Sequence, residues 1–346
     1  MASQQSPTHQ PRPLHPAFAG KASFDFTSAG WNDDFADFWT VDTDSANNHD
    51  HIDFKTGSEG KGASLGLWAP GQAPTLTSNK YLLFGKVSVE VLAAQGRGII
   101  TAIVLKSDSG DEIDWELLGA YENQAQTNYF YDGQALFNTY NTTYRLNTSS
   151  FAASHKYSID WSPHALVFAV DDHPRKTWLP GDIPAHKWPQ TPMQVKLGIW
   201  AVNNVSDPGE IAWAGGVPAL DPARPARALF RSLVLEDLVG MCNRTAAPAE
   251  GRVEYLYDER TRGWGDIQIR GCALRAAVPG VPDITGPGSG GVGPTRTGDG
   301  DDAPTSPGGN APPEETGDDE GGAALTAGRL SSPLAAVVFL VWILIF

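Results

Sequence analysis

The chain has 346 residues, a formal net charge of -15 and 41% hydrophobic residues, which is enough for one large domain with tails or for two ordinary domains. The acidity excludes nucleic acid as an expected partner, because phosphate binding needs clustered lysines and arginines. The 37 glycines, 11 tryptophans and only three methionines are typical of β-sandwiches or barrels, and exposed aromatic rings suit stacking on sugars.

The first segment, residues 1–22, is polar and rich in Pro, Gln and His. It has no apolar run of the kind found in a secretory signal peptide. We predict that this segment is disordered.

The following region, residues 23–240, is expected to be the folded domain. Its apolar residues recur at period two between turn signals, and many of the segments are apolar on both faces, as in two stacked sheets. No long helical period is present. The pattern predicts an antiparallel β-sandwich with strands over 86–94, 98–106, 111–119, 157–162, 165–172 and 195–202.

One of these strands carries a row of acids, DEIDWE, at residues 111–116. Successive side chains of a strand point to opposite faces, so Glu112, Asp114 and Glu116 share one face. Ile113 and Trp115 share the other face, which is expected to pack into the core. Three carboxylates in a row repel one another, and folding alone does not favour them.

Three interpretations of the acid row are open. The acids belong either to a solvent-facing strand or to a Ca²⁺ site. The third interpretation is a glycosidase site in which one glutamate is the nucleophile and the other is the acid/base. Its apolar surroundings favour the third. Cα atoms four residues apart on a flat strand are about 13 Å apart. The carboxyl groups of a retaining enzyme are roughly 5–5.5 Å apart, so strand curvature and the long side chains must close this gap.

The C-terminal third contains three further segments. Residues 241–275 hold strand-like pieces that we interpret as a small extension, such as a hairpin, and residues 276–330 form a stalk rich in Gly, Pro, Ser, Thr and Asp. Residues 331–346 end in an apolar run preceded by a spacer and by small residues that include Gly321 and Gly322, candidate attachment residues. This arrangement is typical of a GPI-attachment signal, with a tail anchor as the alternative.

Other features agree with an extracellular protein. N-glycosylation sequons begin at Asn141, Asn147, Asn204 and Asn243. Cys242 and Cys272 are the only cysteines, so a structural zinc site has no support, and a disulfide between them remains open. A GPI signal requires entry into the secretory pathway. Because residues 1–22 do not resemble a signal peptide, we expect the natural protein to have a different N-terminal segment.

Several motifs together resemble the Crh-type fungal cell-wall transglycosylases of glycoside hydrolase family 16. The resemblance covers about residues 24–238. It rests on Ser107-Asp108 followed by DEIDWELLG (111–119), QTNYF (126–130), PQTPM (189–193), LGIW (197–200) and EIAWAGG (210–216).

The resemblance implies a jelly-roll sandwich of the concanavalin A-like type and retaining chemistry that transfers chitin to β-glucan without a cofactor or a metal. It implies Glu112 as nucleophile, Asp114 as assisting residue and Glu116 as acid/base. It also implies sugar contacts from four residues, Gln126, Asn128, Tyr129 and Trp200. For Gln126 and Asn128 the alternative is cross-strand hydrogen bonding, and for Trp200 it is a place in the core.

The sequence leaves the functional class partly open. The first alternative to a transglycosylase is a plain endo-hydrolase, either a β-1,3(4)-glucanase or a chitinase, since both classes share the catalytic residues. A non-catalytic carbohydrate-binding protein is a second alternative, although such a protein needs no carboxylate pair. We expect the protein to lie at the plasma membrane or in the cell wall. At the membrane, the GPI anchor would hold it in the outer leaflet.

Overall fold

The computed structural model describes residues 12–28, 30, 33–42, 51–54, 60–69, 71–135, 142–183, 187–238, 242–243, 253–271 and 273–274. The predicted stalk, the predicted GPI signal with Gly321 and Gly322, Asn141 and Cys272 lie outside these residues. A disulfide between Cys242 and Cys272 therefore stays an open alternative. Within the described residues, no helix has the length and apolar character needed to cross a membrane.

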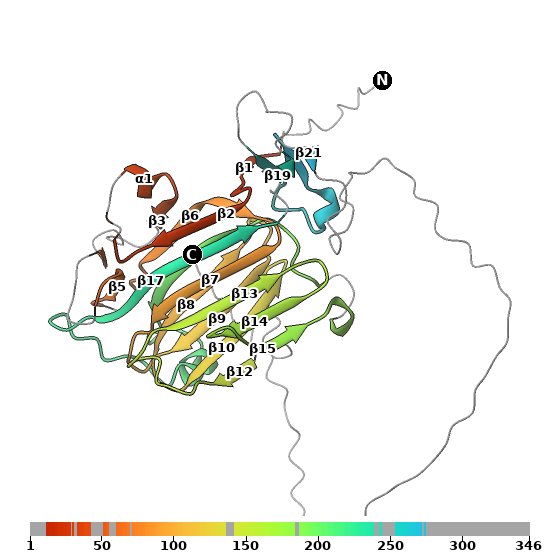
Figure 1. The fold of residues 1–346 in the computed structure, drawn as a ribbon. Helices are drawn as coiled ribbons and strands as arrows, with labels where there is room; N and C mark the ends of the chain where they lie inside the picture. Colours follow the sequence, from red (N-terminus) through yellow and green to blue (C-terminus); the bar gives the residue numbers. More distant parts are fainter. Residues whose placement is uncertain are drawn as a thin grey trace, which may run out of the picture. The chain divides into compact units, whose positions relative to one another are not determined.

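The first of two large sheets contains the strand with the acid row (Figure 1). Its strands are β3 (Trp39–Val41), β6 (Thr75–Leu82), β8 (Ile99–Lys106), β9 (Glu112–Leu118), β10 (Gln124–Tyr131), β11 (Gln134–Ala135), β12 (Thr142–Arg145) and β16 (Met193–Ala201). They follow the order β11-β10-β9-β8-β16-β6-β3, and β12 pairs with β10. The acid strand β9 is thus an inner strand, hydrogen-bonded on both sides.

The second sheet has the order β15-β14-β13-β7-β17-β5-β4, and β2 pairs with β17. Its strands are β2 (Lys21–Asp25), β4 (Ile52–Asp53), β5 (Ala63–Leu67), β7 (Gly85–Leu92), β13 (His155–Trp161), β14 (Leu166–Val170), β15 (His173–Trp178) and β17 (Ala226–Asp237). Every pairing in both sheets is antiparallel. Helical segments are short: α1 (Asp33–Ala36), α3 (Pro208–Trp213), η2 (Pro180–Asp182) and η3 (Trp264–Asp266).

The core lies between the two sheets, and Trp115 of β9 shows how they pack. Its ring centroid is 5.3 Å from that of Tyr157 and 5.5 Å from that of Phe168, both on the second sheet. Its indole Nε1 donates to the Ser158 carbonyl at 3.1 Å, which satisfies the polar end of a buried ring. The predicted antiparallel jelly-roll sandwich is confirmed, because alternating apolar residues of both sheets meet in one core.

A smaller sheet joins the two ends of the described chain. β1 (Leu14–Pro16) pairs with β19 (Glu254–Leu256), which pairs with β20 (Gln268–Arg270), and β18 (Cys242–Asn243) pairs separately with β21 (Ala273–Leu274). β19 and β20 pair antiparallel within the residues assigned to the extension.

The described part of the N-terminal segment differs from the prediction of disorder, because residues 12–22 carry β1 and the start of β2. The His15 ring centroid lies 4.3 Å from that of Tyr257 and 4.8 Å from that of Tyr81. The partners of this segment lie far from it in the sequence, so its local composition does not reveal the order.

Candidate active site

The acid row lies on one face of β9, as the period-two pattern predicts. Glu112 is 2%, Asp114 1% and Glu116 6% exposed, and the whole strand is buried. Ile113 and Trp115, on the opposite face, belong to the main core. The interpretation as a solvent-facing acidic strand is therefore wrong. Burying three carboxylates costs free energy, so a stabilising role does not explain them.

The neighbouring strand β10 sets amide side chains beside the acids. In the antiparallel register Gln126 is opposite Glu116, and Asn128 is opposite Asp114. Both amides therefore lie on the acid face, and they share it because they are two residues apart. The sugar contacts expected of Gln126 and Asn128 stay a prediction.

Tyr129 does not lie on the acid face, which contradicts its predicted sugar contact. Tyr129 is opposite Ile113 in the register, is fully buried and packs in the main core. The resemblance grouped it with Asn128, but adjacent residues of a strand face opposite ways. Phe130 takes the place beside Glu112 instead.

Trp200 lies outside the main core, in a second apolar cluster around β8 and β16. The members of this cluster are Ala73, Ile100, Ala102, Val104, Trp200, Val202 and Ala214, with Ile211 and Trp213 packed against it. The rings of Trp200 and Trp213 are nearly parallel, at 25°, with centroids 6.1 Å apart. Because Ala102 and Val104 are the cross-strand partners of Glu116 and Asp114, this cluster lies on the acid face. It places the rings of Trp200 and Trp213 on the same side of the sheet as the carboxylates.

Sequence reasoning missed Trp213 as a site residue. It ends the short helix α3, and its Nε1 donates to Gln126 Oε1 at 2.7 Å. This bond ties α3 to the strand next to the acids. Trp213 stands within the motif EIAWAGG, so the signal was present, but nothing local indicated that this helix reaches the acid face.

The electrostatics of the acid row separate the three acids. Burial, followed by the charges of Glu112 and Glu116, raises the pKa of Asp114 well above its usual value. The neighbouring Lys106 lowers the pKa of Asp114, but burial and the two glutamate charges outweigh it. Burial, followed by the charges of Glu112 and Glu210, raises the pKa of Glu116 to about 8. At neutral pH Glu116 therefore holds a proton that it can give away.

The loop before β9 is fixed by Asp111, a buried neighbour of the acid row. Its Oδ2 accepts from the Gln190 amide at 2.8 Å and from the Thr191 hydroxyl at 2.8 Å, and its Oδ1 accepts from the Asp132 amide at 3.2 Å. Asp132 in turn pairs with Arg262 of the extension at 2.6 Å. The segments that flank Glu112 are thereby linked to the C-terminal extension.

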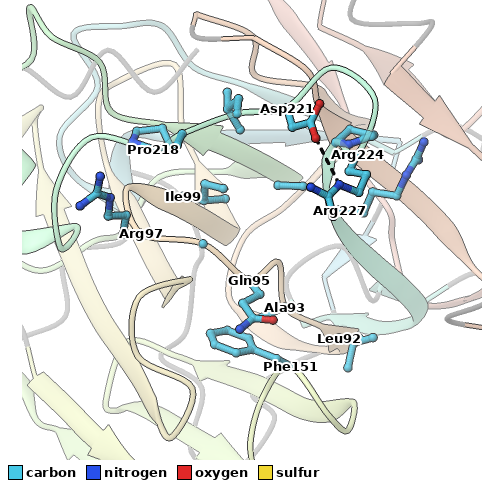
Figure 2. A pocket seen from close by; sticks show the side chains of 15 residues that line it. Leu92, Ala93, Gln95, Arg97, Ile99, Phe151, Pro218, Asp221, Arg224 and Arg227 are labelled. Atoms are coloured by element: carbon cyan, nitrogen blue, oxygen red, sulfur yellow. Dashed lines mark hydrogen bonds and ion pairs between the residues drawn. The ribbon is translucent and has the colours of Figure 1, made fainter.

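A separate hollow of about 570 Å³ lies near the end of β7 and the start of β17 (Figure 2). Phe151, Arg97 and Arg227 line it, and Arg224 in its wall pairs with Asp221 at 3.1 Å. None of its lining residues belongs to the acid row or to the predicted sugar contacts. It is therefore distinct from the candidate active site.

No group of three or more His, Cys, Asp or Glu in the described ranges is arranged to hold a metal ion. In the acid row the nearest cation is instead a side chain, because Lys106 Nζ forms an ion pair with Glu112 Oε2. The chemistry that this arrangement supports is proton and glycosyl transfer by carboxyl groups.

Comparison with known proteins gives one consistent family. Residues 32–215 match the family described as glycosyl hydrolases family 16. Crh-like protein 5 of Aspergillus fumigatus is 36% identical over 218 residues, which cover 61% of this chain and 51% of that protein. The chain thus spans about half the length of this curated relative.

Two solved structures give the same result. An apo Crh5 transglycosylase has a TM-score of 0.61 and 31% sequence identity, covering 75% of this chain and 97% of that one. A Crh5 transglycosylase in complex with NAG has a TM-score of 0.61 and 31% identity, covering 77% of this chain and 99% of that one.

Proposed function

The chain belongs to glycosyl hydrolases family 16, and from this premise we propose that it is a retaining transglycosylase that cuts polysaccharide chains and rejoins them. The observation that carries the proposal is the buried acid row, in which Glu116 has a pKa of about 8 while Glu112 is paired with a lysine. Glu116 is thus able to serve as the proton donor beside a second glutamate that contacts a cation, and a retaining mechanism uses such a pair of acids.

In the proposed first step, Glu112 attacks the anomeric carbon and forms a glycosyl ester. The bond to the leaving oxygen breaks, and Glu116 delivers its proton to that oxygen. In the second step a hydroxyl of the acceptor attacks the same carbon, Glu116 takes the hydroxyl proton, and the Glu112 carboxylate is released. Asp114 is the assisting residue of this scheme.

The proposed donor is chitin and the proposed acceptor is β-glucan. The relative solved with NAG supports a donor of this class, because NAG is the repeating unit of chitin. The paired rings of Trp200 and Trp213 offer an aromatic surface for a sugar, and the amides of Gln126 and Asn128 have groups suited to sugar hydroxyls.

The proposed location is the fungal cell wall or the outer face of the plasma membrane, through the GPI signal predicted at residues 331–346. The relatives named Crh-like proteins come from a fungus, and the resemblance of this chain to Crh-type cell-wall transglycosylases supports this location. Asn147 and Asn204, which begin two of the sequons, are exposed in the structure, as glycosylation requires.

The test incubates the purified protein with chitin oligomers and fluorescent β-glucan oligomers, followed by mass analysis of the products. We expect hybrid products longer than the labelled acceptor, and none from the Glu112→Gln variant. Shortened chitin without hybrids would identify a plain chitinase, and cleavage of glucan alone would identify a glucanase. Binding of either oligomer without any product would indicate a carbohydrate-binding protein and would overturn the proposal.

A further inference from the structure

Lys106 is a charged residue of the acid face that the sequence analysis assigned no role. It is the last residue of β8 and the direct cross-strand partner of Glu112. Its Nζ forms an ion pair with Glu112 Oε2, and its side chain is 26% exposed while that of Glu112 is 2% exposed. A lysine is therefore in direct contact with the proposed nucleophile, in a setting that water screens poorly.

The other charged groups around the acid row make this contact distinctive. Asp114 and Glu116 on β9 and Glu210 on α3 are acids, and the residues of β10 that face the row are uncharged. Lys196 of β16 is another cation of this sheet face, and it binds Asp42 at 2.7 Å. Of the described cations, Lys106 is thus the one in contact with the acid row.

The hydrogen bonds of Glu112 explain what this cation does. Glu112 Oε1 and Asp114 Oδ1 receive no hydrogen bond from an amide, amine or hydroxyl of the described residues. Among the described residues, the contact that holds the Glu112 carboxyl group is the ion pair of its Oε2 with Lys106 Nζ. An opposite charge at hydrogen-bond distance favours the ionised form of a buried carboxyl group.

We propose that Lys106 is a positioning residue that keeps Glu112 ionised and oriented and stabilises its carboxylate when the glycosyl ester breaks. This inference rests on the proposed function. When the ester forms, Glu112 loses its negative charge and Lys106 loses its anionic partner. When the acceptor hydroxyl attacks the anomeric carbon, the carbon–oxygen bond of the ester breaks and the electron pair returns to Glu112. Lys106 therefore favours the second step more than the first.

The test compares Lys106→Met, which removes the charge, with Lys106→Arg, which keeps it. In Lys106→Met we expect the acid limb of the kcat/KM profile to move up by about one to three pH units. We also expect the glycosyl-enzyme to accumulate, visible as added mass on the intact protein. In Lys106→Arg the acid limb should stay close to its position in the parent protein. Lys156→Met is the matched control, because it removes a lysine from an exposed ion pair with Asp172 on the second sheet, and it should change neither readout.

A second measurement does not depend on turnover. Glutamate carboxyl groups labelled with ¹³C are titrated by NMR in the parent and in Lys106→Met, and one resonance should titrate at higher pH in the variant. An unchanged titration in a folded variant would overturn the inference. A shifted titration in a protein that turns over no saccharide would overturn the proposed function alone.

Discussion

The buried carboxyl groups among the described residues form two sets that differ in whether their oxygens accept hydrogen bonds from neighbouring groups. Asp237, at the end of β17, accepts from the amides of Ala19 and Leu83 at 3.1 and 3.2 Å and from the Tyr255 hydroxyl at 2.8 Å. Asp111 is bonded in the same way between three loops. In the acid row, Glu112 Oε1 and Asp114 Oδ1 receive no such bond from the described residues.

This difference separates structural from functional acids. A carboxylate that accepts several backbone amides replaces the water it lost and joins distant segments, so it stabilises the fold. A buried carboxylate with a free oxygen costs stability and persists where chemistry uses it. Burial alone does not distinguish the two groups, because Asp237, Asp111 and Asp114 are all nearly inaccessible.

The largest expected effect is on activity. Glu112→Gln should lower kcat by at least about a thousandfold, because the amide cannot form the glycosyl ester. The melting temperature should stay within a few degrees of the parent, since glutamine preserves the shape of the side chain and its amide oxygen still accepts a hydrogen bond from Lys106. Activity assays paired with thermal melts check this. A variant that loses its fold rather than its turnover would place Glu112 with the structural acids.

Asp237→Asn tests the structural acids in the same way, and its expected effect is on stability rather than on activity. It weakens three hydrogen bonds to a buried carboxylate, so we expect a loss of about 1.5–3 kcal/mol in the free energy of unfolding. The folded fraction should keep its kcat, because Asp237 lies on the second sheet, away from the acid row. Denaturant titration with parallel activity assays measures both. Unchanged stability would contradict the structural role.

The pH profile provides a smaller effect. Glu116 must be protonated to act as the acid, so kcat/KM should fall about tenfold per pH unit above pH 8, where its raised pKa lies. The charge of Glu210 contributes to raising this pKa, so Glu210→Gln should move the alkaline limb to lower pH. Glu236→Gln, at an ion pair with Lys21 on the second sheet, is the control and should leave the limb in place.

The smallest effect concerns the aromatic residues. Trp200→Ala should raise KM for oligosaccharides a few-fold to about tenfold, the range expected when one aromatic stacking contact is lost. Tyr129→Phe should leave KM unchanged, because Tyr129 faces the core. Steady-state kinetics with oligosaccharides of defined length separate the two. A KM effect at Tyr129 equal to that at Trp200 would show that the face assignment does not explain sugar binding.

Much of the site was predictable because strand alternation is a local property. The spacing of Glu112, Asp114 and Glu116 placed them on one face, and the apolar residues between them fixed the opposite face. The same rule, applied strictly to residues 126–130, selects Phe130 over Tyr129. The contacts of Trp213 with Gln126 and of Arg262 with Asp132 were beyond local reasoning, because they join segments far apart in the chain.

By itself the sequence determined the sandwich class and the face of β9 on which the acids lie, because the alternation of side chains along a strand is a local property of the sequence. Only the tertiary structure decided how those acids differ. The charge of Lys106 reaches Glu112 across a strand pair, and α3 brings Glu210 near Glu116. Protonation depends on burial and on neighbouring charge, and both arise when distant segments pack together.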